Sequence, residues 1–160
     1  MRDAVGGSVI ITWILIFLVV ITSILAFSFN YTKAFRLKNA VLDIIEEGQG
    51  LTEGDNGTKF KITSTMNRYG YGNNFTVPGY KCRNGVCIKF NPKNSDTRLK
   101  SKYCGNRKNC SIGSYSVITF IYVNVPIIVD ALETIQARGG LRIQGETSTM
   151  RLSCDTCDSW

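Results

Sequence analysis

The sequence contains no histidine among its 160 residues. Imidazole is the usual general base and the commonest metal ligand in proteins, so both roles lack their usual residue here. The chain also has no glycine-rich phosphate loop and no nucleophile elbow. The only two acidic residues that are adjacent in the sequence are Glu46 and Glu47, at the end of a predicted helix. We therefore expect a protein that is not an enzyme and that uses no cofactor and no small-molecule substrate.

Charge is absent from residues 4–32, a run of 29 residues. Within this run, residues 9–29 would form a helix roughly 31 Å long, which matches the hydrocarbon core of a bilayer. Fifteen of these 21 residues are Val, Ile, Leu or Phe, so insertion into lipid is favoured by roughly 5 kcal/mol or more. We predict a membrane helix that contacts lipid and the equivalent helices of other copies or related subunits. The positions that we expect to make these contacts are Val9, Ile10, Trp13, Ile14, Phe17 and Ile21.

A cleaved signal peptide and a buried core helix are the alternatives to an uncleaved anchor. A signal peptide has an apolar region of about 7–15 residues behind a basic start. The run here is longer, begins after Arg2 and Asp3, and offers only Ala26 as a small-residue cleavage site. A core helix of this length would need a larger domain to cover it than the remaining residues supply. We expect the anchor.

The helical pattern continues beyond the apolar run. Five apolar residues fall on one stripe, whereas the charged residues lie elsewhere on the helix; the stripe is Ala34, Leu37, Val41, Ile44 and Ile45. Gly48 and Gly50 then supply residues suited to a left-handed helix cap. We predict one helix of about 40–45 residues, so that residues 1–50 form an anchor and stalk that docks on a head of residues 51–160.

Six cysteines in so small a head indicate disulfides and an oxidising compartment. The predicted protein is a single-pass membrane protein with its head outside the cytoplasm, displayed at the cell surface if it enters a pilus. Lys33, Arg36 and Lys38 would favour the opposite orientation by the positive-inside rule. The cysteines decide the question, because long domains cross the membrane largely regardless of charge.

The clearest local signal is a β-hairpin at residues 79–90. Asn84-Gly85 is the strongest two-residue hairpin turn, because a type I′ turn needs positive φ at both positions. This turn makes Cys82 and Cys87 a non-hydrogen-bonded pair with Cα atoms about 4.5 Å apart. We therefore predict a Cys82–Cys87 disulfide.

The other four cysteines allow several pairings. Cys104 and Cys110 close a short polar loop most simply by a local bond. Cys154 and Cys157 form a CxxC motif, for which a structural disulfide is expected, with a mixed pairing or a redox role as alternatives. A zinc site is disfavoured because a four-cysteine site needs two CxxC-like arms.

The rest of the head shows three strand patterns and one helix pattern. Residues 59–65 alternate with Phe60 and Ile62 on one face, and residues 115–124 are rich in β-branched and aromatic side chains. Pro126 can begin a helix over residues 126–138, and residues 141–152 return as a strand in which Leu141 and Ile143 alternate. The predicted fold class is α+β, with the long helix packed on a small, mainly antiparallel sheet.

The head is basic, with fifteen Lys and Arg against eight Asp and Glu in residues 51–160. Nine of these cations lie within a stretch of 28 residues, 81–108, in which Asp96 is the single acidic residue. Three aromatic residues lie among or next to them. Such a region can bind DNA or an anionic surface polymer, although a solvated face is the simpler interpretation. The nine are Lys81, Arg83, Lys89, Lys93, Arg98, Lys100, Lys102, Arg107 and Lys108.

Two regions of the chain resemble the TadE/TadG-like pseudopilins of tight-adherence pilus systems. The first combines the lead RDAVGGSVIITWILIFLVV with the basic amphipathic NYTKAFRLKNAVLDII. The second is GGLRIQGETSTMRL, similar to the Thr- and Ser-rich final strand of that group. The resemblance implies a pilin-like fold and a structural role in a pilus or its assembly machine, with adhesion as the cellular outcome.

The chain departs from the processed pilins at one position. Those proteins usually carry glutamate five residues after the peptidase cut, and counting from Ser8 places Thr12 there. The alternative function is a membrane-tethered binding module that captures DNA or an acidic polymer through residues 80–108.

Overall fold

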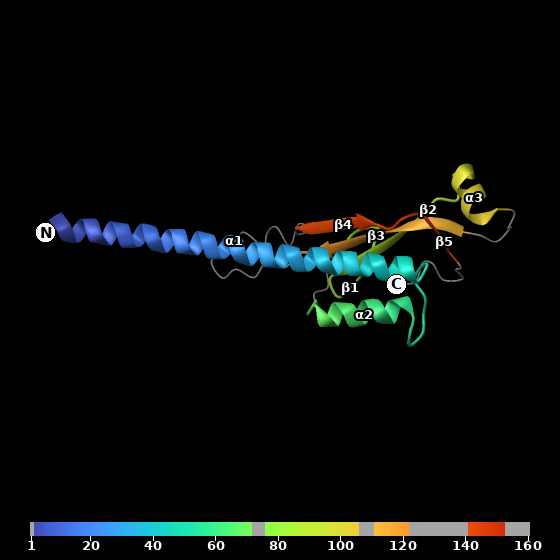
Figure 1. Cartoon of the computed structure of the whole chain (residues 1–160), viewed down its shortest axis with the longest axis horizontal. Helices are drawn as coiled ribbons and strands as arrows, with labels where there is room; N and C mark the ends of the chain where they lie inside the picture. The colour runs from blue at the N-terminus through green and yellow to red at the C-terminus, as the bar shows by residue number, and fades with distance from the viewer. Residues whose placement is uncertain (1, 72–75, 106–110, 122–140, 153–160) are drawn as a thin grey trace.

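The computed structural model describes residues 2–71, 76–105, 111–121 and 141–152, with side chains from residue 8 onward. Helix α1 is a long rod, and the other elements gather around its second half (Figure 1). The described elements are α1 (Arg2–Glu47), α2 (Thr58–Arg68), β1 (Lys81–Arg83), β2 (Val86–Pro92), α3 (Thr97–Cys104), β3 (Ser111–Phe120), β4 (Arg142–Glu146) and β5 (Met150–Leu152).

The predicted α+β class is confirmed. The five strands form one antiparallel sheet in the order β1-β2-β3-β4, and β5 also pairs with β3. Strand β3 is central and nearly all of it is buried, including the hydroxyl side chains of Ser114, Ser116 and Thr119. It begins at Ser111, four residues before the predicted start. The helix predicted over residues 126–138 lies outside the described residues.

Three layers build the core of the head. Helix α1 lies between α2 and the sheet, as Figure 1 shows. Leu37, Val41 and Ile45 of α1 are fully buried in one cluster. The cluster also contains Ile62 and Met66 of α2 and, from the strands, Val86, Ile88, Tyr115, Val117, Met150 and Leu152. The stripe predicted on α1 is thus the centre of the head, and Ile44 packs at its margin.

The strand predicted over residues 59–65 is wrong, because these residues belong to helix α2. Thr58, Ile62 and Met66 are buried at helical spacing, whereas Phe60 is 58% exposed. Thr52 helps to start the helix, since its hydroxyl accepts the Thr58 N–H at 2.9 Å. The short alternation of Phe60 and Ile62 mimicked a strand, and packing on α1 selects the helix.

The segment 141–152 was predicted as one strand, but it forms β4 and β5 with a bulge between them. Glu146 pairs with Ser116 and Met150 with Gly113, so three residues of this segment oppose two of β3. Thr147 fills the bulge by exchanging bonds with Tyr115, because its hydroxyl accepts the Tyr115 N–H and its N–H donates to the Tyr115 carbonyl, both at 2.9 Å. One extra residue reverses the alternation. Met150 and Leu152 therefore join the core on the α1 side.

Helix α1 ends in a Schellman motif whose left-handed residue is not a glycine. The Gly50 N–H donates to the Ile45 carbonyl at 3.0 Å, and the Gln49 N–H donates to the Glu46 carbonyl at 3.2 Å. Gln49 has φ of 49° and occupies the position where glycine was expected. Gly48 is needed for a different reason, because a Cβ there would collide with the Thr58 hydroxyl of α2.

We expect opposite effects from substitutions at these neighbouring positions. Gln49→Gly should stabilise the head by about 1 kcal/mol, because glycine adopts the left-handed conformation without a Cβ penalty. Gly48→Ala should destabilise it by about 1 kcal/mol or more, because α1 and α2 must separate. Chemical denaturation of the full chain in mild detergent measures both. Equal shifts in the same direction would contradict this account of the helix end.

Candidate assembly surface and basic face

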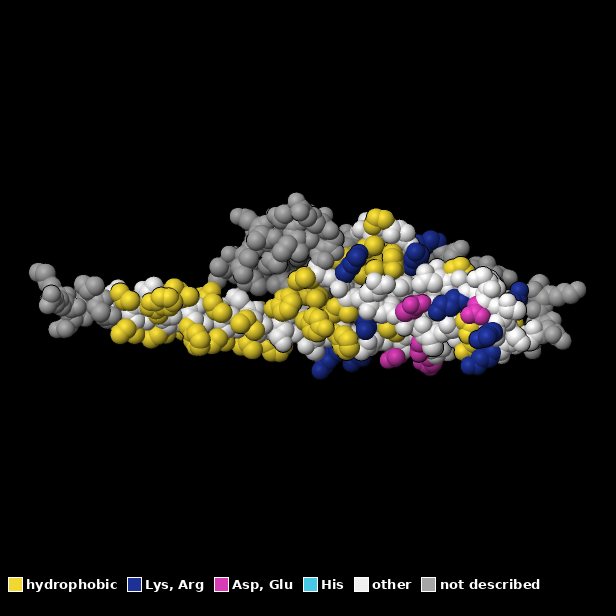
Figure 2. All heavy atoms as spheres, turned by 90° about the horizontal axis from the view of Figure 1, so that it is seen from above, with side chains coloured by type: hydrophobic (Ala, Val, Ile, Leu, Met, Phe, Trp, Pro, Cys, Tyr) yellow, Lys and Arg dark blue, Asp and Glu magenta, His cyan; other side chains and the backbone are white. Residues whose placement is uncertain are grey.

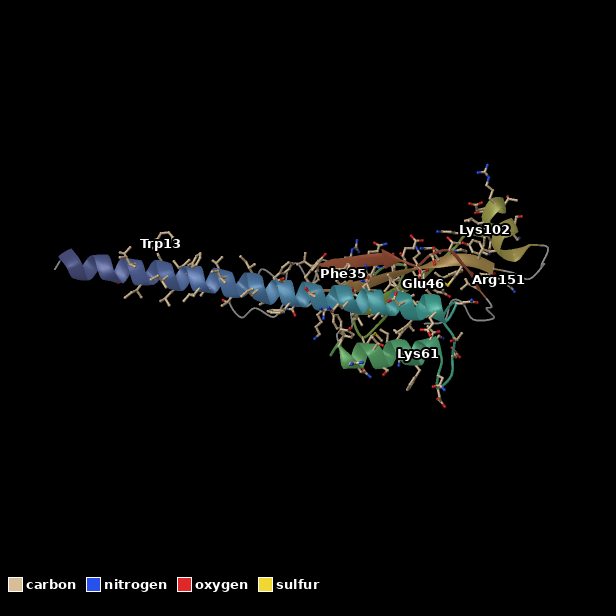
Figure 3. All side chains as sticks on the ribbon, in the orientation of Figure 1. Trp13, Phe35, Glu46, Lys61, Lys102 and Arg151 are labelled. Carbon is tan, nitrogen blue, oxygen red and sulfur yellow. A yellow bond between two sulfur atoms is a disulfide. The ribbon has the colours of Figure 1, made fainter. Side chains whose placement is uncertain are left out.

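The first half of α1 extends beyond the head as an apolar rod, which we define as residues 8–29. Figure 2 shows hydrophobic side chains all along it, and Trp13 projects from it in Figure 3. The residues predicted to form the membrane or filament surface are all between 37% and 68% exposed. They are Val9, Ile10, Trp13, Ile14, Phe17 and Ile21. In the described part of the chain, α1 is the one helix long and apolar enough to cross a membrane.

Three hydroxyl side chains of the rod donate to carbonyls of the helix itself. Thr12 donates to the Ser8 carbonyl at 2.9 Å, and Ser23 donates to the Val19 carbonyl at 2.7 Å. Thr22 does the same with the Leu18 carbonyl at 3.0 Å. A hydroxyl that returns its proton to its own helix adds little cost to an apolar environment. The rod therefore presents an almost entirely apolar exterior.

An aromatic ladder continues from the rod along one side of α1, and the sequence analysis did not identify it. The rings of Phe27, Tyr31 and Phe35 stack at successive distances of 6.5 and 6.4 Å. All three are at least 40% exposed, and the Lys38 Nζ lies 4.4 Å from the Phe35 ring centroid. Their spacing of four residues was the available signal. Phe35 marks the point where the ladder reaches the head (Figure 3).

The predicted basic patch is spread along the head rather than gathered at one place. Lys81 and Arg83 lie on β1 and Lys89 on β2, whereas Arg98, Lys100 and Lys102 lie on α3. Helix α3 packs on Ile112 at the start of β3, and the hairpin tip lies at the end of β3 because Val86 pairs with Thr119. Arg107 and Lys108 fall outside the described residues. The patch therefore divides between the two ends of the sheet.

Helix α3 itself was not predicted, although its start carries a recognisable signal. The Asp96 carboxylate accepts the N–H groups of Arg98 and Leu99 at 3.0 and 3.3 Å. This is the usual N-cap arrangement. The one acidic residue in the basic region is thus occupied with capping the helix, and the three cations of α3 remain exposed.

The disulfide between Cys82 and Cys87 closes the hairpin, with the two Cα atoms 4.0 Å apart. Asn84 and Gly85 both have positive φ, as the predicted turn requires. Cys104 is also disulfide-bonded and is buried beside Ile112. Its expected partner Cys110, like Cys154 and Cys157, lies outside the described residues, so these pairings stay predictions. The described residues include no cluster of side chains that could hold a metal ion.

A polar cluster lies on the face of the sheet that points away from α1. Ser114 is buried and donates a short hydrogen bond to Glu146, whose carboxylate also lies 3.5 Å from the Lys93 Nζ. The Lys93 ammonium donates to the Thr149 hydroxyl at 3.2 Å. The bond from Ser114, followed by the charge of Lys93, lowers the pKa of Glu146 below its ordinary value of 4.5. An ionised Glu146 therefore holds β4 to β3 and to the end of β2.

We expect Glu146→Gln to weaken the head at neutral pH and to have no effect in acid. Because the folded-state pKa of Glu146 is depressed, its stabilisation is fully present above pH 4.5 and is lost as the pH falls through the folded-state value. The loss at pH 7 should be below about 1 kcal/mol, because the carboxylate is half exposed and screened by solvent. Denaturation midpoints of both proteins between pH 7 and pH 3 would test this. A constant difference at all pH values would contradict it.

Burial raises the pKa of Tyr71, which follows α2, to about 12. The phenol therefore stays protonated and donates to the Phe120 carbonyl at 3.0 Å. Lys33 of α1 lies over the same ring, with its Nζ 5.8 Å from the centroid. Tyr71 thus joins the end of α2, the end of β3 and the start of the packed half of α1.

No protein-family model, curated protein or solved structure matches this chain. Its shape alone is pilin-like, because a long apolar N-terminal helix packs by its second half on an antiparallel sheet.

Proposed function

We propose that this chain is a structural, pilin-like subunit. Its rod anchors it in a membrane and later packs against the rods of neighbouring subunits in a filament or at the tip of a pilus machine. The observation that carries this proposal is the rod itself, which is almost entirely apolar, exposed along its length and continuous with the buried centre of the head. The protein is not proposed to turn over any substrate.

The energetics support a partner for the rod. Large contiguous apolar surfaces on soluble proteins mark sites of protein or membrane contact. The rod exposes such a surface along its length, so it requires lipid or several neighbouring helices to cover it. In a filament, helix packing would supply the association energy and the head would face outward. The Cys82–Cys87 disulfide supports a head outside the cytoplasm.

The finer assignment is to a tight-adherence pilus system of the TadE/TadG-like type. It is supported by the resemblance of residues 2–20, 30–45 and 139–152 and by the pilin-like shape. Thr12 stands where processed pilins carry glutamate, and its hydroxyl is bonded to Ser8 within the helix. We therefore propose assembly by apolar packing, without pairing between a glutamate and a neighbouring N-terminus.

Electron microscopy of material sheared from producing cells tests the proposal, together with mass spectrometry of the mature N-terminus. We expect filaments that contain the chain with residues 8–29 retained, and loss of the filaments when the chain is removed. A mature product that begins near Phe27 and behaves as a soluble monomer would refute the assembly function.

A second candidate is a tethered module that binds DNA or an acidic polymer through α3. It is favoured by the three exposed cations of that helix and by the use of Asp96 in capping. Salt-sensitive DNA binding by the full chain in mild detergent, lost when Arg98, Lys100 and Lys102 are replaced by glutamate, would support it. Absence of binding at low salt would exclude it. The full chain is required because α1 forms the core of the head.

A further inference from the structure

Exposed cations gather at the end of the head that lies next to the rod. Val86 pairs with Thr119 and Arg142 pairs with Phe120, so the hairpin tip and the start of β4 both lie at the end of β3. Arg83, in the hairpin, and Arg142 are exposed there.

Helices α1 and α2 bring three more cations to the same level. The Thr119 hydroxyl donates to the Ala34 carbonyl at 3.2 Å, which places the end of β3 beside Lys33 and Arg36. Arg68 ends α2 three residues before Tyr71, which is bonded to Phe120. We call these five exposed residues the collar: Lys33, Arg36, Arg68, Arg83 and Arg142.

The described carboxylates of the head lie away from the collar. Asp43, Glu46 and Glu47 are in the last turns of α1, and Glu53 and Asp55 are in the loop that follows. Among the described residues, no collar cation lies within ion-pair distance of a carboxylate. In Figure 2 the charged side chains nearest to the rod are basic, and the acidic side chains lie farther from the rod. The collar therefore differs from the basic face of α3, whose Asp96 lies within the same helix cap, in having no described carboxylate beside it.

The depth of the collar follows from the length of the rod. Ala34 lies five residues beyond Phe29, or about 7–8 Å along the helix. The headgroup layer of one leaflet is about 5–8 Å thick. If residues 9–29 fill the hydrocarbon core, the collar lies at the depth of the lipid phosphates. The aromatic ladder of Phe27, Tyr31 and Phe35 crosses the same boundary, where aromatic side chains are enriched.

We propose that the collar binds the phosphate groups of anionic phospholipids in the leaflet from which the head emerges. This inference rests on the membrane anchor of the proposed function. Arginine is suited to the role because its guanidinium can form two parallel bonds to a phosphate. The exposed carboxylates of a second copy have the right charge, but they would have to enter the headgroup layer, whereas the lipid is already there.

Electron paramagnetic resonance of the full chain in phosphatidylcholine bilayers tests the proposal. Trace spin-labelled phosphatidylglycerol or phosphatidylcholine reports which lipid is slowed at the protein surface. We expect about a fivefold preference for phosphatidylglycerol, because each cation near the surface attracts anionic lipid, and a large reduction in 1 M salt. Replacing Arg68, Arg83 and Arg142 together by glutamate should remove the preference.

The matched control replaces Arg98, Lys100 and Lys102 of α3 by glutamate. It changes the net charge equally at exposed positions at the other end of the sheet, and the preference should remain. Equal slowing of both lipids by the native chain would overturn the collar while leaving the anchor intact. If both triple variants lose the lipid preference equally, the preference is a net-charge effect and the collar is overturned.

Two further results would also overturn the collar. If the triple variant at Arg68, Arg83 and Arg142 keeps the lipid preference and loses only self-association, the collar faces a second copy. If neither lipid is slowed by the native chain, the rod is not in the bilayer, and the proposed anchor fails together with the collar.

Discussion

Val41→Asp is expected to unfold the head. Val41 is fully buried between α2 and the sheet, and an aspartate there would place an unpaired carboxylate among apolar side chains. The expected cost is more than about 4 kcal/mol, which is a large part of the stability of a small domain. Near-ultraviolet circular dichroism of the full chain in mild detergent should lose the signal of the buried Tyr115.

The reciprocal substitution provides the control. Asp43 lies two residues farther along α1 and is exposed, so the helix itself accepts an aspartate in this turn. Asp43→Val should change the free energy of unfolding by no more than about 0.5 kcal/mol. A Val41→Asp protein with a native spectrum and an unchanged denaturation midpoint would show that α1 is not the centre of the head.

The second large effect is expected from charge in the rod. Ile14→Asp and Phe17→Asp together should release the chain from the membrane and abolish its assembly. Each aspartate near the centre of a span costs about 3 kcal/mol, and each lost apolar residue removes about 0.5 kcal/mol, a total of about 7 kcal/mol. This exceeds the roughly 5 kcal/mol that favours insertion. Alkaline extraction of membranes and electron microscopy of sheared material measure the two outcomes.

Phe60→Asp with Leu141→Asp is the matched control, because it replaces two exposed apolar residues of the head by aspartate. Phe60 and Leu141 are 58% and 40% exposed, so the charge change is the same but lies outside the rod. This protein should stay in the membrane fraction and assemble. If the Ile14 and Phe17 double variant also did so, the rod would not be the anchor.

Local and periodic signals predicted much of the fold. The length of α1 and its buried stripe followed from an uninterrupted helical pattern, and the hairpin followed from Asn84-Gly85. Strand β3 was visible because residues 115–124 are rich in β-branched and aromatic side chains. In each case the residues that determine the element lie within the element itself.

Two of the errors arose where distant contacts decide the structure. Residues 59–65 became a helix because Ile62 packs against α1, which lies earlier in the chain. The bulge at Thr147 depends on Tyr115 in another strand, so no local pattern could place Met150 and Leu152 on the core side. Helix α3 was missed although Asp96 carries a local capping signal, and this error was avoidable.

The candidate site was likewise predictable only in part. The rod was predictable because its signal is contiguous and extreme in composition. The collar was not, because it combines four elements whose outermost members, Lys33 and Arg142, are 109 positions apart in the sequence. These cations are brought together by the pairing of β3 with its neighbours, by the contact of Thr119 with Ala34 and by the bond from Tyr71 to Phe120.

The absence of any break in α1 between the rod and the core has a mechanical consequence. One helix of 46 residues passes from the exposed half into the buried half without a hinge, so the head cannot swivel independently of its anchor. A pulling force on the head is therefore transmitted along the axis of α1. In a fibre built from such subunits, stretching would have to occur by sliding between neighbouring rods, because no flexible joint within the subunit can absorb it.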